Sequence, residues 1–216
     1  MATHPTRAWR FTGRIAGWGT ASGWRFVLGA WWQSPLDTFA DVMVERPDGE
    51  RVLLAPTAEV AEFVGATYHF DDVVIVPVTV DRGGRPASAP TTAGETWQVT
   101  AGPLAARLEL GGRPAVGLAL RAVPGPLAGA PAFARVTDPV ARVLLRGVRT
   151  RGTAGGGRTE TYGARDLHRL AAATSGWDGQ DLGPLRDLDP PVRFGFGSAP
   201  RRPSVTDLVT TVRIPR

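Results

Sequence analysis

The stretch Thr38-Phe-Ala-Asp-Val-Met-Val-Glu-Arg-Pro-Asp-Gly-Glu-Arg-Val-Leu-Leu-Ala55 indicates a β-hairpin and points to the fold class of the whole chain. Residues 38–46 and 50–55 form two strand-like runs on either side of a turn sequence. In that turn, Pro47 presets the first backbone dihedral and Gly49 accepts a positive φ. The segment therefore predicts two antiparallel strands joined at Pro47-Asp48-Gly49.

The two-residue period of β-strands continues through most of the first half of the chain. The positions that share a strand face are Phe11, Gly13, Ile15 and Gly17 in one segment, and Trp24, Phe26, Leu28, Ala30 and Trp32 in the next. Further strands are predicted at 73–80, 108–110, 113–123, 146–151, 158–170, 192–196 and 204–214, with Gly111-Gly112 as a second hairpin turn. About ten strands favour a single antiparallel β-barrel or a strongly curved sheet, because a flat sheet of that size leaves exposed edges.

Two short helices interrupt the predicted strands. One runs from Ala58 to Tyr68 with Thr57 as its N-cap, and the other runs from Asp138 to Leu145. Residues 82–95 are rich in Gly, Pro, Ala and Thr without any periodicity, which predicts a mobile loop. No linker divides the chain, so residues 1–216 are predicted to form one β-rich domain.

Composition excludes several kinds of chemistry. The chain has no lysine, cysteine or asparagine, and all 25 basic residues are arginines. Lysine Schiff bases, phosphate-loop lysines, thiolate nucleophiles, iron–sulfur clusters and disulfides are therefore excluded. The sequence also shows no metal-ligand spacing and implies no cofactor.

The charge and the N-terminal sequence bear on partners and location. The computed isoelectric point of 11.0 overstates the basic character, because the formal net charge is only +5. Nucleic-acid binding through arginines is thus a third hypothesis, behind the two developed below. No signal segment and no apolar run of about 20 residues is found, so we expect a cytoplasmic protein without membrane contact. Whether it forms homo-oligomers is left open.

Four tryptophans lie close together in the sequence, at Trp18, Trp24, Trp31 and Trp32. Tryptophans at this density either fill a barrel interior or line an apolar ligand cavity. Our first functional hypothesis is therefore a β-barrel that binds an apolar small molecule in a tryptophan-lined cavity. The alternative is that these side chains fill the core.

Two resemblances accompany this pattern. Gly29-Ala30-Trp31 resembles the G-x-W motif of the lipocalin-like (calycin) barrels, in which a tryptophan plugs the barrel base and a C-terminal arginine, here Arg213, packs over it. The resemblance implies a ligand-binding barrel. The stretches 39–49 and 191–198 resemble conserved uncharacterised proteins of GC-rich bacteria, and that resemblance implies no known activity.

The segment from Thr12 to Gly19 matches the TGxxxGxG motif of the short-chain dehydrogenases. That motif binds a dinucleotide only between a strand and a helix, whereas an aromatic strand follows it here. The family's catalytic lysine is also missing. We therefore interpret these glycines as strand residues, and the glycines of 152–157 as part of a hairpin loop.

The second functional hypothesis is a cofactor-independent enzyme, such as a cyclase, isomerase or hydrolase. Strand periodicity places Tyr162, Asp166 and His168 on one face, where a carboxylate can orient an imidazole and a phenol can donate to an oxyanion. The competing interpretation is a surface strand with an ordinary histidine.

Overall fold

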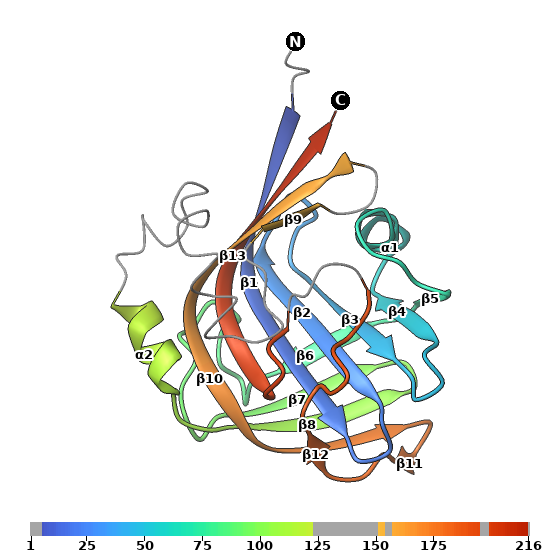
Figure 1. The fold of residues 1–216 in the computed structure, drawn as a ribbon, viewed down its shortest axis with the longest axis vertical. Helices are drawn as coiled ribbons and strands as arrows, with labels where there is room; N and C mark the ends of the chain where they lie inside the picture. The colour runs from blue at the N-terminus through green and yellow to red at the C-terminus, as the bar shows by residue number, and fades with distance from the viewer. Residues whose placement is uncertain (1–5, 123–150, 154–156, 195–198, 216) are drawn as a thin grey trace.

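The structure, a computed structural model, describes residues 6–122, 151–153, 157–194 and 199–215. Strands make up 53% of the molecule, and the main sheet curls through 271° as an open half-barrel (Figure 1). The strands of this sheet are β1 (Thr6–Thr20), β2 (Arg25–Gln33), β3 (Phe39–Glu45), β4 (Arg51–Ala55), β5 (Asp72–Ile75), β6 (Val78–Asp81), β7 (Thr96–Ala101), β8 (Leu104–Leu110), β10 (Thr159–Trp177) and β13 (Ser204–Pro215). The predicted mainly β class with a strongly curved sheet is confirmed.

The strand order is β5-β4-β3-β2-β1-β13-β10-β8-β7-β6. The pairs are antiparallel except β4 with β5, which is parallel and is bridged by the helix α1 (Ala58–Gly65). The sheet is therefore mixed at this one pair, where the sequence predicted antiparallel pairing throughout. Three short strands lie beside the main path: β9 (Arg151–Thr153) and β11 (Gln180–Asp181) pair with β10, and β12 (Leu185–Arg186) pairs with β1.

The two ends of the strand order are neighbours in sequence. Only Val76 and Pro77 separate β5 from β6, which lie at opposite edges of the curled sheet. The single buried strand predicted at 73–80 is thus two half-exposed edge strands. Proline at this point fits the break, because it cannot donate a ladder hydrogen bond. This short connection links the two edges of the half-barrel covalently.

The curled sheet has two hydrophobic cores, one on each face. The inner core fills the concave side and includes Trp18, Phe26 and Trp97. The outer core lies on the other face of β1 to β4, β10 and β13, where α1 and the segment around Leu188 cover it. All seven residues of β3 are consequently buried, whereas β7 and β8 alternate between buried and exposed positions.

The predicted hairpin at 38–55 is confirmed. The backbone N–H of Arg46 donates to the carbonyl of Glu50 at 2.8 Å, and Gly49 has φ 93°. The predicted first helix is also confirmed, because the hydroxyl of Thr57 accepts from the backbone N–H of Val60 at 3.2 Å. This helix ends at Gly65, three residues before the predicted end.

Other sequence predictions fail or lie outside the described residues. The strand predicted at 113–123 is wrong, because residues Ala115–Arg121 form the helix α2, which packs against β10. Gly111 donates its backbone N–H to the carbonyl of Arg169 on β10, and the carbonyl of Gly112 accepts from the N–H of Arg169. The glycine pair therefore continues alongside β10 and does not form the predicted hairpin turn. Residues 192–194 are irregular and not a strand. The helix predicted at 138–145, the strand residues 146–150 and residues 195–196 are outside the described ranges.

The glycines of the TGxxxGxG segment lie within β1, as the sequence predicted. A Cβ atom at Gly13 would stand 2.4 Å from the carbonyl oxygen of Ala30 on the neighbouring strand, and one at Gly19 would stand 2.6 Å from the carbonyl oxygen of Asp187. These glycines therefore permit close approach of neighbouring backbone.

Candidate functional site

The predicted trio of Tyr162, Asp166 and His168 does not share one face of β10. The pairing of β10 with β13 shifts register between Ala164 and Asp166, which leaves Arg165 as the extra residue of a β-bulge. A shift by one residue moves all following side chains to the opposite face. Tyr162 therefore belongs to the outer core, whereas Asp166 and His168 lie on the inner face, and the prediction of a shared face is wrong.

Asp166 and His168 form a buried polar contact between β10 and the segment that leads into α2. Arg113 donates to both carboxylate oxygens of Asp166 at 2.8 Å, and Arg121 lies 3.5 Å away. Burial alone would raise the pKa of Asp166, but the hydrogen bonds from Arg113 outweigh it and leave the pKa lowered. His168 is only 1% exposed; its Nδ1 lies 3.1 Å from the carbonyl of Gly111, and its Nε2 lies 3.7 Å from Asp166. The ion pair of this contact is therefore that between Arg113 and Asp166, and the imidazole of His168 lies beside it.

The four clustered tryptophans divide among three environments. Trp18 is fully buried in the inner core and donates to the hydroxyl of Ser175 at 3.0 Å. Trp24 packs against Trp177 in a tilted arrangement, with ring centroids 4.8 Å apart. Trp32 lies on the inner face beside the guanidinium of Arg14, whereas Trp31 packs against the outer core and lines both the inner and the outer cavity. The tryptophans therefore do not form one cavity wall.

An inner cavity of about 190 Å³ lies between β2 and β3 on one side and β6 and β7 on the other. Its aromatic walls are Trp31, Trp32, Phe39 and Trp97, and its other lining residues are Arg14, Ala30, Thr38, Ala40, Val78, Val80, Arg82 and Ala87. Two of the four predicted ligand-binding tryptophans, Trp31 and Trp32, line this cavity. Trp18 and Trp24 line neither this cavity nor the outer one described below.

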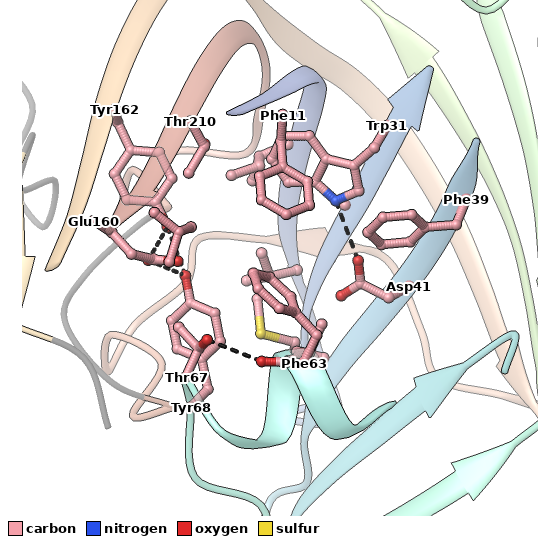
Figure 2. Close-up of a pocket in the computed structure, with 16 residues that line it drawn as sticks. Phe11, Trp31, Phe39, Asp41, Phe63, Thr67, Tyr68, Glu160, Tyr162 and Thr210 are labelled. Carbon is pink, nitrogen blue, oxygen red and sulfur yellow. Dashed lines mark hydrogen bonds between the residues drawn. The ribbon is translucent and has the colours of Figure 1, made fainter. Parts of the chain in front are cut away.

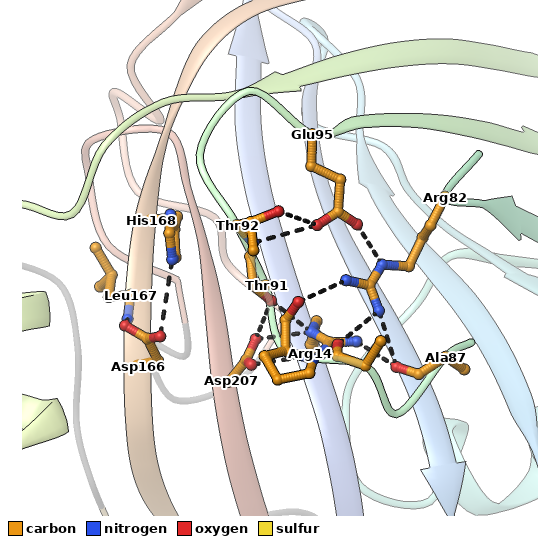
Figure 3. A network of polar contacts seen from close by, with 12 residues as sticks. Arg14, Arg82, Ala87, Thr91, Thr92, Glu95, Asp166, Leu167, His168 and Asp207 are labelled. Carbon is orange, nitrogen blue, oxygen red and sulfur yellow. Dashed lines mark hydrogen bonds and ion pairs between the residues drawn. The ribbon is translucent and has the colours of Figure 1, made fainter. Parts of the chain in front are cut away.

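Two arginines close one side of the inner cavity (Figure 3). Arg82 donates to Glu95 at 2.5 Å, and Arg14 donates to Asp207 at 2.7 Å. Burial alone would raise the pKa of Glu95, but the hydrogen bonds from Arg82 and from the indole of Trp97 leave it lowered. Each cation thus has its own carboxylate partner.

The same arginines hold the loop that the sequence predicted to be mobile. The Nη1 atom of Arg82 donates to three backbone carbonyls, those of Pro86, Ala87 and Ala89, at 2.9–3.0 Å. Arg14 donates to two of these carbonyls as well. Residues 82–95 therefore wrap around two guanidinium groups. These contacts favour an ordered segment over the predicted mobile loop.

An outer cavity of about 40 Å³ lies under α1, on the opposite face of the sheet (Figure 2). Apolar and aromatic side chains from β1, β2, β3, α1 and β13 make up most of its wall: Phe11, Ile15, Val27, Trp31, Phe39, Met43, Phe63, Val64 and Val212. Its polar groups are Asp41, Thr67, Tyr68, Glu160, Tyr162 and Thr210. Buried polar groups in an apolar cavity are a frequent sign of a functional site.

One side of the outer cavity carries a tight cluster of three oxygens. The hydroxyls of Tyr68 and Tyr162 lie 2.6 Å apart, and they lie 2.8 and 3.0 Å from the same oxygen of Glu160. Burial raises the pKa of Glu160 and raises the pKa values of both phenols well above their ordinary range. Thr210, beside this cluster, has a buried hydroxyl that forms no hydrogen bond within the described part of the chain.

Asp41 occupies the other side of the outer cavity, as Figure 2 shows. Its side chain accepts a hydrogen bond from the indole N–H of Trp31 at 3.3 Å. Burial raises the pKa of Asp41 to about 7, although the Trp31 hydrogen bond acts in the opposite direction. A Cβ atom on Gly29 would stand 2.6 Å from Asp41 and 2.7 Å from the Trp31 nitrogen, so glycine is required here for the contact to form.

The Trp31–Asp41 contact gives Gly29 and Trp31 of the Gly29-Ala30-Trp31 stretch a structural role. Arg213, which the lipocalin resemblance assigned to the tryptophan, is exposed on β13. The sequence analysis included Tyr162 but missed Tyr68, Glu160 and Asp41. A signal for Asp41 was present, because it is an acid inside the otherwise apolar run from Phe39 to Val44. No comparable signal marks Tyr68, which α1 brings to β10 from 92 positions away.

Among the described residues, no group of three or more His, Cys, Asp or Glu side chains is placed to hold a metal ion. The helices within those ranges are all too short or too polar to cross a membrane. The chain matches no known family model, and comparisons with curated proteins and with solved structures find no similar protein.

Proposed function

We propose that the protein binds a neutral, apolar small molecule in the inner cavity, between Trp32 and Trp97. The observation that carries this proposal is the cavity of about 190 Å³ with indole, valine and alanine walls. An apolar protein cavity of roughly 150 Å³ holds a benzene ring. The size therefore favours a ligand with a single ring or a short branched chain, below the 300–1,000 Å³ range of sites for larger molecules.

The charges around the inner cavity favour a neutral ligand. Arg14 and Arg82 are paired with Asp207 and Glu95, and their remaining donors face backbone carbonyls. An anionic ligand would have to compete with these buried partners for the same hydrogen-bond donors. The guanidinium of Arg14 lies 4.6 Å from the ring centroid of Trp32, so this arginine positions an aromatic wall of the cavity.

Toluene is a suitable probe, because it is apolar, neutral and of the right size. We expect isothermal titration to show saturable binding of toluene to the wild-type protein. Ala30→Leu places three more carbon atoms in the cavity and should weaken binding at least tenfold, which corresponds to about 1.4 kcal/mol. The matched control is Ala105→Leu on the exposed face of β8, which should leave the affinity unchanged.

Tryptophan substitutions locate the ligand independently. Trp32→Ala should weaken toluene binding, because Trp32 lines the cavity. Trp24→Ala should leave binding unchanged, because Trp24 does not line it. Trp97 also lines the cavity, so Trp97→Ala should weaken toluene binding more than Trp24→Ala does. Absence of saturable binding, or equal affinities in the Ala30 and Ala105 variants, would show that the inner cavity is only a gap in the core.

A further inference from the structure

The oxygen cluster in the outer cavity is one proton short unless Glu160 is protonated. Three oxygens, from Tyr68, Tyr162 and Glu160, lie at mutual distances of 2.6, 2.8 and 3.0 Å. Each contact is short enough to require a hydrogen between the two oxygens, and the two phenols supply only two. A proton on Glu160 supplies the third, so that each oxygen donates once. The geometry thus favours a neutral carboxylic acid at this position.

The charged groups near this cluster agree with a neutral Glu160. Arg158 is the nearby cation, but its guanidinium donates to the carbonyl of Phe63 at 2.8 Å and to the hydroxyl of Thr67 at 2.9 Å. It is therefore engaged at the end of α1 and not with the carboxyl group. Glu160 is 3% exposed, so water cannot solvate a carboxylate there.

The opposite side of the cavity carries an acid with a different environment. Asp41 is 4% exposed and has the indole of Trp31 as its hydrogen-bond donor, with no arginine or histidine paired to it among the described residues. It lacks the phenol donors that stabilise Glu160. The two carboxyl groups therefore divide into one that keeps its proton and one that can exchange it near neutral pH.

We propose that the outer cavity catalyses cofactor-independent proton transfer on a small neutral carbonyl compound, with Asp41 as the base and the Tyr68–Tyr162–Glu160 cluster as the acid. The carboxylate of Asp41 takes a proton from the carbon next to the carbonyl group. The C–H electron pair forms the new carbon–carbon double bond, and the carbonyl oxygen takes a proton from a tyrosine hydroxyl. Glu160 returns a proton to that tyrosine, and its carboxylate keeps the remaining phenol hydrogen bonds.

The size and polarity of the cavity set the substrate class. A volume of about 40 Å³ admits only a few non-hydrogen atoms, such as the carbonyl group and its neighbouring carbon. The free hydroxyl of Thr210 offers one more hydrogen-bonding group at this position. Within the described ranges, no unpaired cation lies between the two acids, and this disfavours an anionic substrate. The reverse transfer, with a proton returned to the same carbon atom, restores the ketone, so the exchange needs neither an oxidant nor a metal.

Hydrogen–deuterium exchange tests this activity directly. Acetone and butanone are incubated with the protein in D₂O, and loss of the α-proton signal is followed by NMR. We expect the wild-type protein to accelerate exchange over buffer, with a rate that rises with pH and levels off above about 7, the pKa of Asp41. Asp41→Asn and Glu160→Gln should each reduce the acceleration at least about 100-fold. Asp178→Asn, at an exposed turn, should leave it unchanged.

A spectroscopic measurement keeps the proposal testable if a variant folds poorly. At pH 9, where Asp41 is ionised, the infrared spectrum of the wild-type protein should still show the C=O stretch of a protonated carboxyl group, and Glu160→Gln should remove it. Absence of this band, or absence of exchange above the buffer rate for both ketones, would overturn the proposal. Equal exchange rates for the wild-type protein and Asp41→Asn would overturn it as well.

Discussion

Replacing Asp41 with asparagine should stabilise the protein at neutral pH and leave its stability almost unchanged near pH 4. Burial raises the pKa of Asp41 from 3.8 to about 7 in the folded protein. Between these two values the unfolded chain has released the proton while the folded protein still holds it. The free energy of unfolding therefore falls as pH rises through this window, by about 1.4 kcal/mol for each pH unit.

The window spans about three pH units. The carboxyl group of Asp41 therefore lowers the free energy of unfolding by an amount on the order of 4 kcal/mol at pH 7 and above. Asparagine cannot ionise, and its carbonyl oxygen can still accept the hydrogen bond from Trp31. Urea unfolding of the wild-type protein and of Asp41→Asn, followed by circular dichroism from pH 4.5 to 8, gives the difference directly. Comparing two variants cancels the contributions of other titrating groups.

The shape of this difference is the decisive result. It should be small at pH 4.5, grow with pH, and become constant above about pH 7. Asp178→Asn, which removes an exposed carboxylate, should give a difference near zero at every pH. If the difference in free energy of unfolding between the wild-type protein and Asp41→Asn does not change with pH, the reasoning is refuted. Asp41 would then have the same pKa in the folded and unfolded states.

Three further substitutions test the packing and the ion pairs by urea unfolding. His168→Ala should destabilise the protein by about 2 kcal/mol, because the imidazole is 1% exposed and leaves a cavity; a loss under about 0.5 kcal/mol would contradict its burial. Thr57→Ala should cost about 1 kcal/mol through loss of the helix cap, and an unchanged stability would argue against the cap. Arg82→Met leaves the charge of Glu95 without its main partner and should cost about 3 kcal/mol, whereas the partly exposed Arg85→Met should have little effect. Similar losses in the two arginine variants would refute the assigned role of Arg82.

Sequence periodicity predicted the strand-rich class because local side-chain patterns determine it. The hairpin around Pro47 and Gly49 follows from turn chemistry, and the N-cap at Thr57 follows from local hydrogen bonding. The sequence could not reveal the strand order, because β5 and β6 are separated by two residues and yet lie at opposite edges of the sheet. The helix at 115–121 was missed because Ala, Val and Leu fit both a strand and a helix.

The candidate sites depended on features that periodicity does not carry. The bulge at Arg165 reverses the faces of the β10 residues that follow it, up to a second register shift between Leu170 and Ala172, and it separated Tyr162 from Asp166 and His168. The prediction that Tyr162 takes part in acid–base chemistry nevertheless remains, with Glu160 as its neighbour instead. Because β1 to β4 are buried on both faces, the alternation of apolar residues could not show which cavity each tryptophan lines.

The pattern of arginine pairing separates structural from functional carboxyl groups. On the outer face of β3, Glu45 and Asp41 are four positions apart and both are buried. Glu45 accepts from Arg25 and from Arg193, each at 3.1 Å, so its charge is neutralised. Asp41 instead has a tryptophan partner, in a chain with 25 arginines. Stability alone favours pairing or removing a buried carboxyl group, because an unpaired one costs free energy whenever it ionises. Unlike Glu45, Asp41 thus has no cationic partner among the described residues, and this supports a role in proton exchange.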